Sequence, residues 1–95
     1  MKKQEIIKHV NQSFHNWIES EGLSEYRNDL DFAVRETAED EHCLVEICFD
    51  GLLYDLINNE FGYLNEEKAE KIFGLSKFEW EPYSSWKIDI HKEVA

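Results

Sequence analysis

Residues 31–49 read DFAVRETAEDEHCLVEICF, and this stretch decides the fold because its apolar residues alternate with polar ones. Alternation with a period of two is typical of strands that bury one face better than the other. The polar segment TAEDEH, residues 37–42, separates two alternating runs. The stretch therefore predicts a β-hairpin with a sharply acidic tip.

The segment before this hairpin has a different period. Its apolar residues recur every three or four positions, which predicts an amphipathic helix over about residues 3–21. Gly22 follows, where a helix commonly stops. The apolar positions are Ile6, Ile7, Val10, Phe14, Trp17 and Ile18.

The segment after the hairpin predicts two helices and then two strands. Asp50 is a natural N-cap for a short helix, and Asn65 and Gly74 have the residue types that begin and end another. Residues 78–81 and 86–91 alternate as strands do, with a turn expected over residues 82–85. Trp86, Ile88 and Ile90 are expected to face inward.

The element order is thus α-β-β-α-α-β-β, which predicts a small α+β domain with its helices packed on one antiparallel sheet. The chain has 95 residues, room for one domain, and we expect residues 1–95 to form a single acidic unit. Hydrophobic residues make up 42% of it, too many for a disordered acidic tail. The sequence has neither a signal-peptide pattern nor an apolar run long enough for a membrane span, so we expect a cytoplasmic protein with no membrane partner.

Residues suited to catalysis or metal binding are scattered. The two cysteines, Cys43 and Cys48, are five positions apart in a strand pattern, so they should point to opposite faces and form no disulfide. The histidines show no spacing typical of a metal site or a catalytic pair. We therefore expect no enzyme, no catalytic residue, no metal and no cofactor. The four histidines are His9, His15, His42 and His91.

Charge is distributed very unevenly. Residues 36–67 contain no lysine or arginine but hold ten acidic side chains, and the whole chain has a net charge of -11. Concentrated negative charge attracts a basic surface and speeds association with it. We expect these carboxylates to gather into one patch that binds a basic protein. The candidate residues are Glu36, Glu39, Asp40, Glu41, Glu46, Asp50, Asp55 and Glu60.

Aromatic residues are concentrated in the later part of the chain. Tyrosine and tryptophan are favoured as anchors in protein interfaces. Tyr63, Trp80 and Tyr83 are the candidates for partial exposure and partner contact, whereas a small domain needs other aromatic side chains to fill its core. Phe73, Phe78 and Trp86 are predicted to be core residues.

These patterns lead to a functional hypothesis. Direct nucleic-acid binding is disfavoured, because phosphate contacts require clustered lysine and arginine. The main hypothesis is an inhibitor whose carboxylates mimic phosphates in the nucleic-acid channel of a nuclease or another basic nucleic-acid-binding protein. In composition alone, the chain resembles anti-CRISPR and anti-restriction proteins of phages and mobile elements. An immunity or antitoxin protein would use the same electrostatics, and the alternative of another class is an adaptor that docks through its aromatic C-terminal half.

Overall fold

The structure is a computed structural model that describes residues 2–37, 43–60, 65–84 and 86–94, except for the side chains of residues 59, 60 and 84. Its α+β architecture, with an antiparallel sheet, confirms the predicted fold class. Residues 38–42 of the hairpin tip and Tyr63 lie outside the described residues.

The predicted hairpin is formed by β1 (Leu30–Glu36) and β2 (Val45–Asp50), which pair antiparallel. Two later strands, β3 (Phe78–Ser84) and β4 (Lys87–Glu93), pair with each other, and β4 also pairs with β2. The sheet order is therefore β1-β2-β4-β3, which places the two hairpins side by side. This order brings residues from the middle and the end of the chain into register.

The first helix, α1 (Lys3–Ser20), follows the predicted amphipathic segment, and a 3-10 helix, η1 (Ser24–Asp29), leads from it into β1. After β2, the short helix α2 (Gly51–Asp55) continues into a π-type turn, η2 (Leu56–Glu60). Asp50 caps α2 as predicted, because its Oδ1 accepts a hydrogen bond from the Gly51 N–H at 2.7 Å.

The predicted caps of the next helix, α3 (Glu66–Phe73), are both confirmed. Asn65 Oδ1 accepts a hydrogen bond from the Lys68 N–H at 2.9 Å, and Gly74 ends the helix with a φ of 68°. A short 3-10 helix, η3 (Leu75–Lys77), then connects α3 to β3.

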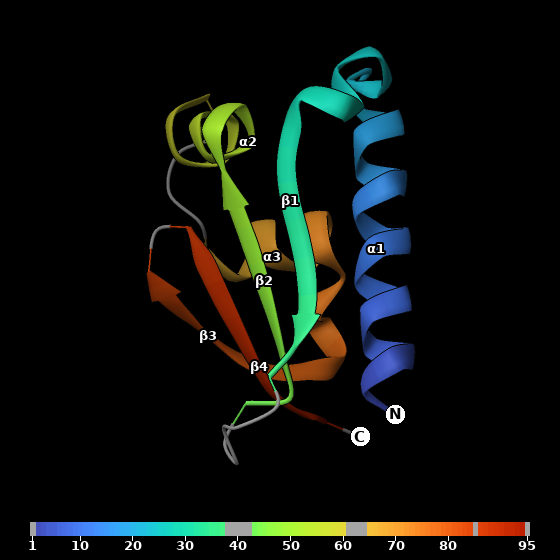
Figure 1. Ribbon diagram of the computed structural model, residues 1–95, viewed down its shortest axis with the longest axis vertical. Coiled ribbons are helices and arrows are strands. Elements are labelled where there is room, and N and C mark those ends of the chain that lie inside the picture. The colour runs from blue at the N-terminus through green and yellow to red at the C-terminus, as the bar shows by residue number, and fades with distance from the viewer. Residues whose placement is uncertain (1, 38–42, 61–64, 85, 95) are drawn as a thin grey trace.

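Helices α1 and α3 lie on one face of the sheet (Figure 1). The hydrophobic core lies between these helices and the sheet. Inward-facing strand residues such as Ile47, Ile88 and Ile90 are fully buried there, and so is Phe73 of α3. Phe78 is also buried, which confirms its predicted place in the core. In the described part of the chain, the opposite face of the sheet is not packed against α1 or α3, and we call it the open face (Figure 1).

Two local predictions are wrong. Residues 82–84 were expected in a turn, but β3 continues through Pro82, which is tolerated because β3 is an edge strand with a register shift at this point. Trp86 was expected to face the core, but it is 46% exposed. Because β4 begins only at Lys87, the alternation that buries Ile88 and Ile90 does not extend to Trp86.

Candidate interaction surface

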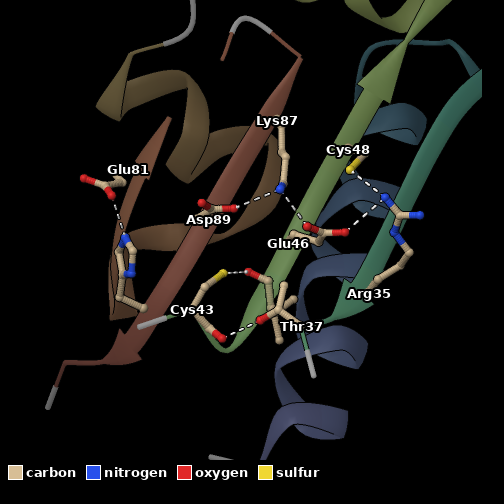
Figure 2. Close-up of polar contacts among 10 residues, drawn as sticks. Arg35, Thr37, Cys43, Glu46, Cys48, Glu81, Lys87 and Asp89 are labelled. Atoms are coloured by element: carbon tan, nitrogen blue, oxygen red, sulfur yellow. Dashed lines mark hydrogen bonds and ion pairs between the residues drawn. The ribbon is translucent and has the colours of Figure 1, made fainter. Parts of the chain in front are cut away.

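The open face carries a row of charged side chains that crosses all four strands. Strand register places Arg35 opposite Glu46, Glu46 opposite Asp89, and Asp89 opposite Glu81. Directly opposed residues on neighbouring strands lie on the same face of a sheet, so three carboxylates and one guanidinium form a line. Figure 2 shows this row together with Lys87, which lies between Glu46 and Asp89.

Glu46 is the centre of an ion-pair network within this row. Its Oε2 lies 2.8 Å from Lys87 Nζ, and its Oε1 lies 3.0 Å from Arg35 Nη2 (Figure 2). The side chains of Glu46 and Lys87 are only 16% and 19% exposed. The negative charge of Glu46 is therefore balanced inside the chain, although the sequence pattern grouped it with the partner-binding acids.

The two cations of the network stay fully charged. The hydrogen bond to Glu46 is the largest cause of the raised pKa of Lys87, and the hydrogen bond from Arg35 Nη2 to Cys48 Sγ is the largest cause of the raised pKa of Arg35. Lys87 Nζ also lies 4.4 Å from the centroid of the Tyr83 ring and 3.8 Å from Asp89 Oδ1. A single ammonium group thus links β2 and β4 to the exposed ring of β3.

Replacing Glu46 with glutamine is expected to lower the free energy of unfolding by about 1–3 kcal/mol, because the poorly exposed ammonium of Lys87 loses the closer of its two carboxylate partners. Urea unfolding measures the change. E81Q is the matched control: Glu81 lies 3.1 Å from His91 Nε2, but its side chain is 67% exposed, so its loss should change stability by less than about 0.5 kcal/mol. Equal effects of the two substitutions would contradict a structural role for Glu46.

The described acidic candidates do not form a single patch. Asp50 pairs in register with Asp31 at one end of the hairpin, whereas Glu36 lies at the other end, opposite Val45. The five residue steps from Asp31 to Glu36 span about 17 Å of strand. The expectation of one patch is therefore wrong for the described residues, which place acidic groups at both ends of the sheet.

The acidic candidates belong to different elements of the fold. Glu36 is exposed and accepts a hydrogen bond from Gln4 Nε2 at 2.8 Å. Asp50 and Asp55 are exposed at the start and end of α2. The backbone of Glu60 lies in η2, and its side chain is not described. Glu39, Asp40, Glu41 and Tyr63 lie outside the described residues.

The aromatic candidates differ in exposure. Tyr83 is 67% exposed, whereas Trp80 is half-buried and packs against the core. Two residues that the sequence patterns did not select also belong to the open face, namely Asp31 and Trp86. The sequence contains a signal for Asp31, because its alternation with Ala33 and Arg35 places all three residues on one face of the strand. No comparable signal existed for Trp86, which only the actual start of β4 brings to this face.

Three further features of the described residues concern metal binding, the cysteines and membrane spans. No group of three or more histidine, cysteine, aspartate and glutamate side chains among them is arranged to hold a metal ion. Cys43 and Cys48 are not joined in a disulfide; Cys43 is buried and Cys48 is half-buried. None of the described helices combines the length and the apolar character needed to cross a bilayer.

Comparison of the chain with protein-family models, with curated protein sequences and with solved structures found no match.

Proposed function

We propose that this chain is a small acidic interaction domain that binds the basic nucleic-acid-binding surface of another protein and blocks it. The partner would be a nuclease or another basic nucleic-acid-binding enzyme. An anti-CRISPR or anti-restriction inhibitor and an immunity or antitoxin protein would both act in this way.

The observation that carries this proposal is the charge per unit length. The chain has a net charge of -11 and a longest dimension of 35 Å, which is about 3.2 Å per negative charge. One strand of a nucleic-acid duplex carries one charge per about 3.4 Å. Along its long axis the protein therefore has about the charge density of a single nucleic-acid strand.

The described acidic side chains are spread along the hairpin and do not form one patch. Asp50 and Glu36 lie at opposite ends of the β1–β2 hairpin, so negative charge is available at both ends of this hairpin. Strands β1 and β2 run roughly along its long axis (Figure 1). A partner channel that normally follows a nucleic-acid backbone would meet carboxylates at both ends.

Competition with nucleic acid tests the proposal. The immobilised chain would capture proteins from a nuclease-treated bacterial lysate at low salt, and each captured protein would then be mixed with fluorescent DNA. We expect the captured protein to bind the DNA and the free chain to displace it, as measured by fluorescence anisotropy. A ternary complex in which the partner holds both DNA and the chain would contradict the proposal.

Matched variants make this test specific. The triple variant E36Q/D50N/D55N should displace DNA less well than the unmodified chain. The control E5Q/E25Q/E70Q changes the net charge equally at exposed positions outside the candidate set, and it should be affected less.

A second candidate function is an adaptor that docks through aromatic side chains. The observation in its favour is that Tyr83 is 67% exposed and Trp86 is 46% exposed at neighbouring positions of the β3–β4 hairpin. An adaptor held mainly by these side chains would bind its partner without displacing nucleic acid and with little dependence on salt.

A further inference from the structure

The open face contains a hollow at the end where α2 begins. It has a volume of about 360 Å³, and the side chains around it come from β1, β2 and the residue just before β4. Its size lies within the range of small ligand pockets. The residues that line it include Asp31, Ala33, Arg35, Cys48, Asp50 and Trp86.

Two carboxylates on adjacent strands line this hollow. Asp31 and Asp50 are register partners in β1 and β2, and both are exposed. Like charges directly opposite each other on a sheet destabilise it. Neither carboxylate forms an ion pair with any residue that the structure describes. Asp50 Oδ1 accepts the capping hydrogen bond from the Gly51 N–H, but no cation in the described chain pairs with either aspartate.

An exposed indole lies beside the carboxylates. Trp86 lines the same hollow, and its carbonyl oxygen accepts a hydrogen bond from the Phe49 N–H at 2.9 Å, which fixes its backbone next to Asp50. Tryptophan presents the best aromatic face for a cation. The contact of Lys87 with the Tyr83 ring shows a cation over an aromatic face in the same hairpin.

The hollow also contains one cation, Arg35. Its guanidinium is already engaged, because Nη2 lies 3.0 Å from Glu46 Oε1 and donates a hydrogen bond to Cys48 Sγ at 3.2 Å. The charge of Arg35 is balanced by Glu46, and that of the two aspartates is not. The hollow therefore complements a positive group.

We infer that this hollow binds an arginine side chain from a basic segment of the partner. This inference rests on the function proposed above. Arginine fits better than lysine for two reasons. Its planar guanidinium can donate parallel hydrogen bonds to carboxylates, and it stacks on an aromatic face. The Asp31 and Asp50 carboxylates would accept those hydrogen bonds while the Trp86 indole covers the plane of the guanidinium.

Nuclear magnetic resonance with a minimal probe tests this inference. The probe is a short glycine–serine peptide with one arginine, acetylated and amidated so that the guanidinium is its only charge. We expect the largest shift changes at the backbone amides of Ala33 and Cys48 and at the Trp86 indole N–H. The same peptide with lysine should bind more weakly, and Trp86→Leu should reduce the preference for arginine.

Two double variants separate a specific site from general attraction. D31N/D50N should weaken binding of the arginine peptide at least about fivefold, and asparagine at position 50 keeps a helix N-cap, so the fold is preserved. The control E25Q/E70Q removes the same charge at exposed positions outside the hollow, and it should weaken binding less than about twofold. Urea unfolding of both variants verifies that they are folded.

Equal weakening by the two double variants, or shift changes spread over the whole acidic surface, would overturn the arginine site. Neither result would affect the competition between the chain and DNA for the captured partner, so the proposed function is tested separately. Conversely, an arginine site could be found in a chain that fails to displace DNA.

Discussion

Replacing Phe73 with alanine is expected to lower the free energy of unfolding by about 3–5 kcal/mol, the range for removing a buried aromatic side chain. Phe73 is fully buried at the end of α3. Its ring stacks against those of Phe14, Phe32 and Phe49, with centroid distances of 6.2, 5.8 and 5.7 Å. These three rings come from α1, β1 and β2, so the cavity would open where the helices meet the sheet.

Urea unfolding monitored by circular dichroism measures this effect. Tyr83→Ala is the matched control, because it removes an aromatic side chain that is 67% exposed and should change stability by less than about 1 kcal/mol. An F73A variant as stable as the control would contradict the central place of Phe73 in the core.

Replacing Gly74 with alanine is expected to lower the free energy of unfolding by about 2–4 kcal/mol, for two separate reasons. Gly74 has a φ of 68°, a conformation that costs an L-residue about 1–2 kcal/mol. A Cβ atom there would also lie 2.8 Å from His9 Nε2 and would clash with the side chain of Ser13. His9 Nε2 forms a 2.9 Å hydrogen bond with the Gly74 carbonyl oxygen, so α1 cannot move away without losing this contact.

Gly22 provides the matched control for this prediction. Its φ is 70°, and a Cβ atom there would have no atom within 4 Å. G22A should therefore show only the backbone cost of about 1–2 kcal/mol. The difference in unfolding free energy between the two variants measures the close packing of α1 against the end of α3. Equal losses of unfolding free energy in G74A and G22A would mean that the packing of α1 does not disfavour a side chain at position 74.

Local signals predicted the elements well. Asn65 and Gly74 bound α3 as expected, because capping depends on residues close in sequence. Apolar spacing likewise placed Trp17 and Ile88 in the core. The error at Trp86 has a different origin, because the exact start of β4 depends on pairing with β2 and β3 rather than on alternation alone.

The candidate surface was less predictable because it depends on register between distant strands. Counting charges along the chain grouped Glu46 with the acidic residues around it, but sheet order places it between Arg35 and Lys87. Asp31 was overlooked because it precedes the stretch without lysine and arginine. Only the pairing of β1 with β2 brings it opposite Asp50.

The central claim is that negative charge drives binding to a basic partner, and the salt dependence of that binding tests it most directly. The dissociation constant for the partner identified by DNA competition would be measured by isothermal titration calorimetry from low to high sodium chloride. Screening lengths fall from about 10 Å at 0.1 M to about 3 Å at 1 M, so we predict that the dissociation constant rises at least about tenfold over this range. A dissociation constant that stays within about twofold would contradict the account and favour an adaptor held by aromatic contacts.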